Sequence, residues 1–267
     1  MSSLFLYLGS EGLTFLKSGL LPFLRPGELG QPFLSERPSY QAIQQNKLSQ
    51  KDYIQHLQQQ YQKLPDHLRN MVSFDYFVEQ SEKKRSEIEA GIQRVTSAPI
   101  SCPDLSQYRI LRLFSEPALL SLWQGRGDSG MALELDIGLC GWLSEEYRGE
   151  RQILAELKSV DSWLPEQQED WLLQQPSSYS ECPGEWRLLR SLTAADRLIQ
   201  VTGQERAMYR LPYQGLKRII AGNGWQPESL ASLQAYVKRD LNLRQAQLAQ
   251  LQLDPLTMDL EVIDLGR

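Results

Sequence analysis

Two groups of residues in this sequence have types and spacing that could do chemistry. Asp136, Glu156 and Lys158 have the composition of a divalent-metal site of nuclease type. Carboxylates supply hard oxygen ligands, and a lysine can stabilise the charge that develops on a phosphate. Residues 125–130 read Gly-Arg-Gly-Asp-Ser-Gly and match the G-x-G-x-x-G pattern of dinucleotide-binding loops.

The glycine-rich pattern works only between a strand and a helix, where the N-terminus of the helix holds the pyrophosphate. Here a helical turn is expected before the pattern, and a strand is expected after it at residues 131–136. The order is reversed, so we interpret residues 125–130 as a loop that can border a pocket.

Histidine and cysteine are sparse. His56 and His67 are the two histidines, and Cys102, Cys140 and Cys182 lie far apart. Neither set has the spacing of a zinc site or of a nucleophilic triad. We therefore expect surface histidines, free thiols and no metal.

The bulk composition restricts the class of partner. The chain has 267 residues, 41% of them hydrophobic and 23% charged, with a net charge of −5 and a pI near 5.3. This balance is that of a folded protein and opposes non-specific nucleic-acid binding. No apolar stretch reaches the length of a membrane span, and the start lacks the basic region of a signal peptide. A cytoplasmic location without membrane binding is expected.

The elements that must position any site are helices and strands mixed without a βαβ repeat. Strands are predicted at 4–8, 20–24, 108–115, 131–136, 185–192, 206–211, 216–221, 248–253 and 258–265. Helices are predicted at 10–17, 117–123, 165–173 and 227–241. We expect one α+β domain over 1–267, with a twisted or split, mostly antiparallel sheet flanked by helices.

Residues 40–95 form the expected exception to this pattern, a helical hairpin inserted in the domain. Tyr53, Leu57, Tyr61 and Leu64 recur every three or four residues among many glutamines. We expect this apolar stripe to face the rest of the domain and the glutamines to face solvent.

Three segments together resemble the bacterial domain-of-unknown-function family 2971, which includes proteins similar to abortive-infection components of phage defence. Near the start, Leu-Tyr-Leu at 6–8 and Pro-Phe at 32–33 resemble its opening strand and loop. In the middle, Phe-Ser at 114–115, Trp123 and the strand ending at Asp136 resemble its central block. Later, Glu-Trp-Arg at 185–187 and Ile-Ile-Ala-Gly at 219–222 resemble its last strands.

The sequence departs from that family in places that bear on activity. Leu6 and Leu8 flank Tyr7, where the family has a basic residue in the first strand. Pro183 stands where the family has the first acid of a Glu-x-Glu pair. A member with these changes is expected to have lost part of any common chemistry.

The order of these blocks resembles the layout of ADP-ribosyltransferases. The resemblance implies that Glu185 is the catalytic carboxylate and Ser115 its orienting partner. It further implies that Tyr7 and Trp123 line an NAD pocket, with Arg187 available for a phosphate. A carboxylate suits this chemistry, since cleavage of the nicotinamide–ribose bond builds positive charge on the ribose.

Three functions stay open at this point. The first is an NAD-dependent, ADP-ribosyltransferase-like enzyme of bacterial defence or toxin type with eroded activity. The second is a non-catalytic member of the same family that binds a protein partner. The third is a metal-dependent nuclease that uses Asp136, Glu156 and Lys158. From the order of the blocks we predict that Ser115 and Glu185 lie on neighbouring strands and that their side chains open into the same cleft; a shared cleft would favour the first function.

Overall fold

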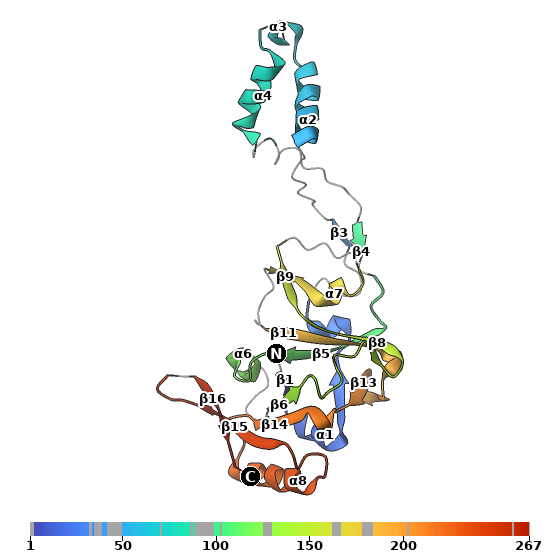
Figure 1. Cartoon of the computed structure of the whole chain (residues 1–267), viewed down its shortest axis with the longest axis vertical. Helices are drawn as coiled ribbons and strands as arrows, with labels where there is room; N and C mark the ends of the chain where they lie inside the picture. The colour runs from blue at the N-terminus through green and yellow to red at the C-terminus, as the bar shows by residue number, and fades with distance from the viewer. Residues whose placement is uncertain are drawn as a thin grey trace. The chain divides into compact units, whose positions relative to one another are not determined.

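The computed structural model describes residues 3–31, 34, 39–41, 50–69, 71–85, 88, 99–101, 103–124, 130–161, 167–177, 184–201, 203–257 and 259–266. Helices combine with a large, mostly antiparallel sheet, which confirms the predicted α+β class (Figure 1). The chain divides into two compact units, Met1–Glu36 with Pro103–Arg267, and Arg37–Cys102.

The first unit contains a nine-stranded sheet with the strand order β16-β15-β14-β6-β1-β5-β11-β8-β7. Its strands are β1 (Ser3–Leu8), β5 (Tyr108–Phe114), β6 (Met131–Asp136), β7 (Glu146–Tyr147), β8 (Glu150–Glu156), β11 (Glu185–Ser191), β14 (Leu216–Ala221), β15 (Gln247–Leu253) and β16 (Leu260–Asp264). All neighbours pair antiparallel except β14 and β15, which are parallel and are joined through α8 (Pro227–Arg239).

Smaller elements surround this sheet. A three-stranded sheet has the order β12-β13-β2, and a parallel pair joins β9 and β10. Their bounds are β2 (Leu20–Phe23), β9 (Lys158–Val160), β10 (Gln174–Pro176), β12 (Arg197–Val201) and β13 (Gln204–Arg210). The short helices are α1 (Gly12–Ser18), α6 (Leu120–Gln124) and α7 (Asp170–Leu173).

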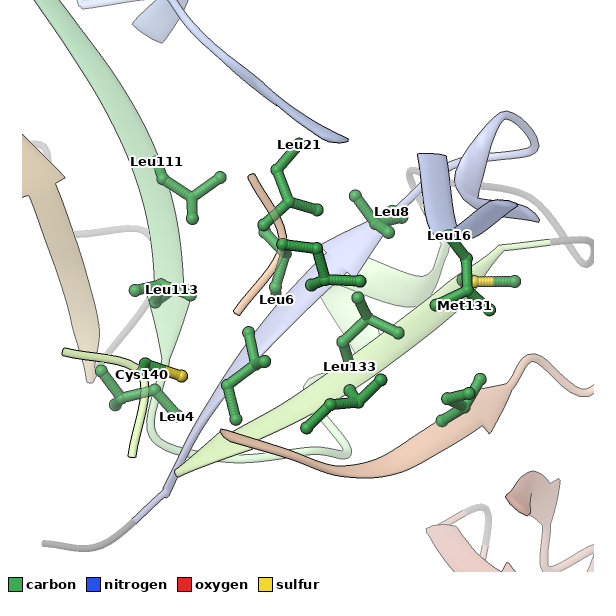
Figure 2. Packing of buried hydrophobic residues seen from close by; sticks show 14 of the residues in the cluster. Leu4, Leu6, Leu8, Leu16, Leu21, Leu111, Leu113, Met131, Leu133 and Cys140 are labelled. Atoms are coloured by element: carbon green, nitrogen blue, oxygen red, sulfur yellow. The ribbon is translucent and has the colours of Figure 1, made fainter. Parts of the chain in front are cut away.

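β1 lies inside the large sheet, and its side chains contribute to the apolar packing on both faces of that sheet. Leu4, Leu6 and Leu8 belong to the larger apolar cluster, and Figure 2 shows them beside leucines of β5 and β6. Phe5 and Tyr7 belong to a smaller cluster. Successive side chains of a strand point to opposite faces. The continuous apolar run of β1 is therefore what a strand buried on both sides requires.

The predicted order of elements at the start of the chain is confirmed, although α1 begins at Gly12, two residues later than predicted. α1 ends at Gly19, whose φ of +67° is the left-handed conformation that a glycine adopts without strain. β2 follows directly and lies at the edge of its three-stranded sheet. Pro22 has no N–H for a ladder, so an edge is where this strand can be accommodated.

The unit Arg37–Cys102 contains the predicted helical hairpin. Its elements are β3 (Ser39–Gln41), α2 (Gln50–Gln62), α3 (Asp66–Arg69), α4 (Phe74–Glu82) and β4 (Pro99–Ser101). The apolar stripe of α2 packs against α4. The Tyr53 hydroxyl donates to the Ser81 carbonyl (2.9 Å), and the Tyr61 ring lies 5.4 Å from that of Phe74. Two short helices need this mutual burial to be stable.

Two predicted helices are shorter in the structure. The stretch 165–173 is described from residue 167, and its helix is confined to α7. The stretch 117–123 reduces to α6, because its first three residues are not helical. In the described ranges, no helix combines the length and the apolar character needed to cross a membrane.

Candidate functional site

Ser115 and Glu185 lie at the same end of two neighbouring antiparallel strands. β5 pairs with β11, and Glu185 stands opposite Phe114. Ser115 follows β5 directly, and its N–H donates to the carbonyl of Gly184 (3.0 Å). Glu185 therefore lies in β11 and Ser115 directly after the neighbouring β5, close to the predicted arrangement. Glu185 shares the face of Phe114, and Ser115 is the next residue, so strand alternation does not support the predicted opening of both side chains into one cleft. In the described part of the chain, no hydrogen bond joins the Ser115 hydroxyl to the Glu185 carboxylate.

Gly184 lets the two strands meet at this point. Its φ is +72°, and a Cβ added there would lie 2.1 Å from the Ser115 Oγ. The half-buried Ser115 side chain thus occupies the space that the missing side chain of residue 184 leaves free. A serine in this place fits against the neighbouring backbone, which is a structural reason for its presence.

The Glu185 carboxylate is held by two arginines. Arg112 donates from Nε to Oε1 (3.0 Å) and from an Nη atom to Oε2 (2.6 Å), and Arg187 donates from Nε to Oε1 (2.9 Å). Arg112 stands opposite Arg187 in the register, and Glu185 precedes Arg187 by two residues, so the three side chains share a face. We call these three residues the Arg-Glu-Arg cluster.

The Arg-Glu-Arg cluster is buried and tied to two other segments. Glu185 is 4% exposed and Arg187 is 1% exposed. Arg187 also donates to the Leu172 carbonyl at the end of α7 (2.5 Å) and to the side-chain oxygen of Gln31 (3.3 Å). Gln31 in turn donates to Gln175 in β10 (3.0 Å). The cluster therefore fastens the segments around Gln31 and α7 to the large sheet.

The electrostatics keep Glu185 ionised. Burial by itself would raise the pKa of its carboxyl, but the contacts with Arg112 and Arg187 outweigh burial and hold the pKa below its ordinary value. Burial lowers the pKa of Arg187, and the Glu185 carboxylate opposes that effect. Two guanidinium groups against one carboxylate give the cluster one net positive charge.

Tyr7 and Trp123 lie together in the smaller apolar cluster. Their ring centroids are 5.3 Å apart in an edge-to-face arrangement, and both residues are buried. The Tyr7 hydroxyl donates to the Glu116 carbonyl (2.7 Å), and the Trp123 Nε1 donates to the Pro117 carbonyl (3.0 Å). These bonds hold the turn after β5 against the sheet, so both aromatic residues have a structural task.

The acids and the lysine proposed for a metal are not brought together. Asp136 ends β6 and Glu156 ends β8, and the strands β1, β5 and β11 lie between them. Four strand spacings of about 4.8 Å separate the two strands by about 19 Å. Asp136 pairs with Lys217 (2.9 Å) and accepts from the N–H of Gly138 (3.0 Å). Over the residues that the structure describes, no group of three potential metal ligands occurs.

Some residues named from the sequence lie outside the described ranges. They include Cys102, Cys182, Pro183 and residues 125–129 of the glycine-rich pattern. Cys140 is described and buried, and burial raises the pKa of its thiol to about 12.

The residue that sequence reasoning missed is Arg112. The sequence did contain a signal for Arg112, since an arginine inside a largely apolar strand requires a partner for its charge. A second arginine pair lies on the other face of the same strands, where Arg109 stands opposite Arg190. The Arg190 guanidinium lies 3.6 Å from the centre of the Tyr147 ring and donates from Nε to Gln152 (3.1 Å).

Comparisons with family models, with curated proteins and with solved structures found no match for this chain. The resemblance to the family of phage-defence proteins therefore stays a prediction from short motifs.

Proposed function

We propose that this protein acts by binding a protein partner and that Glu185 is a structural residue. The observation that carries this proposal is the set of three hydrogen bonds from Arg112 and Arg187 to the Glu185 carboxylate. A carboxylate that stabilises a ribosyl cation must direct an uncompensated negative charge at the substrate. The charge of Glu185 is already matched, and the group around it is positive.

Freeing Glu185 for catalysis would be costly. Breaking a buried ion pair leaves an uncompensated charge and costs about 3–5 kcal/mol. Tyr7 and Trp123, the residues expected to stack on nicotinamide, are buried with their polar atoms bonded to backbone carbonyls. These contacts favour a scaffold over a cofactor pocket.

The helical unit offers side chains suited to a protein contact. Met71 is 79% exposed, and Leu68 and Tyr76 are also exposed, all at or close to the turn that contains α3. Methionine and tyrosine are adaptable contact residues in protein interfaces. An apolar side chain as exposed as that of Met71 buries little surface in the fold and is available for contact with a partner.

The test has two arms on the full chain. The first measures nicotinamide release from NAD by the wild type and by Glu185→Gln, and we expect no turnover in either. The second places a photo-crosslinking residue at position 71, with the exposed Lys84 as the matched control position. We expect a defined adduct from position 71 only. Turnover that disappears in Glu185→Gln would overturn the proposal.

An ADP-ribosyltransferase-like activity is the second candidate. One observation supports it, namely that Ser115, whose N–H donates to Gly184, and Glu185 occur at the same end of β5 and β11. On this alternative, substrate would have to displace Arg112, which is the more exposed of the two arginines. Calorimetric titration with NAD tests it, and micromolar binding that weakens in Glu185→Gln would favour the enzyme.

A further inference from the structure

The outer edge of β8 is open over half of its length. β11 covers one side of β8, and on the other side β7 pairs only with Glu150 and Arg151. The N–H of Leu157 donates to Glu185 on the β11 side (2.8 Å), and that of Gln152 donates to Glu145 on the outer side (2.8 Å).

The backbone groups of Leu154 and Glu156 therefore point outward. Along a strand in an antiparallel ladder, alternate residues direct their N–H and C=O groups to the same side. Leu154 and Glu156 follow Gln152 by two and four residues, so they share its outward direction. Within the described ranges, no strand pairs with these outward groups.

A groove lies beside this edge. A cavity of about 560 Å³ runs between residues 142–146 and residues 151–154. Leu143, which is 65% exposed, stands on its wall and can contact an apolar side chain of an added strand. An open edge with an adjoining groove is the geometry by which proteins take up an extended peptide as an extra strand.

The charges around the groove select the chemistry of that peptide. Glu145, Glu146, Glu150 and Glu156 are exposed, and none of them forms an ion pair with another described residue. Arg151 is already paired with Glu169 (2.8 Å). These four glutamates outnumber Arg151 and the exposed Lys158, so the rim is acidic and complements a basic partner, whereas a second copy of this chain would bring two acidic rims together.

We propose that the edge of β8 binds an extended basic segment of a partner protein, in which basic side chains meet the acidic rim and an apolar one meets Leu143. This inference rests on the proposed partner-binding function and adds, beside the exposed side chains of the helical unit, a second contact surface with a stated ligand chemistry. The outward N–H and C=O groups of Leu154 and Glu156 form the backbone hydrogen bonds with the added strand.

The probe is a fluorescent peptide of about seven residues, the length of an ordinary strand, in which Lys or Arg alternates with Val or Leu. Binding to the full chain is measured by fluorescence anisotropy. We expect saturable binding that weakens about tenfold or more when alternate amides of the peptide are N-methylated. A peptide with Glu in place of Lys and Arg should not bind.

Two protein variants test the same edge. Leu154→Pro removes one outward N–H but no N–H of the ladder with β11, and it should weaken binding about tenfold. The double variant Glu145→Lys/Glu146→Lys should also weaken peptide binding about tenfold. The control Glu228→Lys, on α8, should leave peptide binding unchanged. The N-methylated peptide needs no altered protein, so the test holds if Leu154→Pro fails to fold.

Absence of binding by the basic peptide, equal binding of the acidic peptide, or insensitivity to N-methylation would overturn the edge proposal. None of these outcomes changes the result expected in the nicotinamide-release assay. Failure of the β8-edge proposal is therefore distinguishable from failure of the partner-binding function.

Discussion

Arg112 and Arg187 stand directly opposite each other on β5 and β11, and both donate hydrogen bonds to the carboxylate of Glu185. Like charges in opposite positions of an antiparallel pair destabilise a sheet. The Glu185 carboxylate offsets that repulsion. On the same face of the sheet, Arg187 also binds the Leu172 carbonyl and the Gln31 side chain. The stability of this end of the sheet therefore depends on one carboxylate.

Glu185→Gln should destabilise the protein by about 3–5 kcal/mol, since it leaves two guanidinium groups without their buried anion. Urea unfolding followed by circular dichroism measures the change. The control Glu156→Gln, at an exposed position, should stay within about 0.5 kcal/mol of wild type. Adding Arg187→Met to Glu185→Gln should recover part of the loss, and strictly additive effects would contradict a coupled cluster.

Acid should weaken the fold partly through Glu185. Its pKa is lowered in the folded state, so its contribution is fully present above the ordinary value of 4.5 and is lost as the pH falls through the folded pKa. The unfolded chain takes up this proton first, which favours unfolding. The free energy of unfolding, measured from pH 6 downward, should therefore fall less steeply in Glu185→Gln. Identical slopes would contradict the lowered pKa.

Gly184→Ala should cost more than an ordinary glycine replacement. A left-handed alanine costs about 1–2 kcal/mol, and the contact with Ser115 Oγ should add about 1–3 kcal/mol. Gly203→Ala is the matched control, because its φ is +80° and nothing lies within 4 Å of an added Cβ. Ser115→Ala combined with Gly184→Ala should recover part of the difference in thermal melting. Equal losses of stability in Gly184→Ala and Gly203→Ala would show that the contact with Ser115 adds no cost at position 184.

Cys140 should resist alkylation in the native protein. Burial raises the pKa of its thiol to about 12, so only about one molecule in 10⁴ carries a thiolate at pH 8. Iodoacetamide treatment followed by peptide mass mapping should find Cys140 unmodified until denaturant is added. Modification in seconds under native conditions would contradict its burial.

Local patterns predicted much of the fold. The apolar run of β1, Gly19 after α1, the strands β5 and β11 and the amphipathic helix α8 lie close to where the sequence placed them. Each depends on neighbouring residues only, through side-chain period or a backbone preference. β7, β9 and β10 were not predicted, because strands of two or three residues leave no readable period. The longer strands β8 and β12 were missed as well.

The site was predictable only in part. The motif order predicted Ser115 and Glu185 on neighbouring strands. Glu185 lies in β11, and Ser115 directly follows the neighbouring β5. The same register sets Arg112 against Arg187, and no local pattern reports a pairing between residues about seventy positions apart. The position of Asp136 four strands from Glu156 likewise depends on strand order, which residue types do not encode.

The central place of β1 has a consequence for synthesis on the ribosome. β1 pairs with β5 and β6, which begin at Tyr108 and Met131, so the first strand emerges more than a hundred residues before its partners. The hairpin of α2 and α4 is local and can form in that interval. Until β5 and β6 have been synthesised, the apolar segment of β1 has neither of its partner strands. During translation it is therefore a natural binding site for a chaperone.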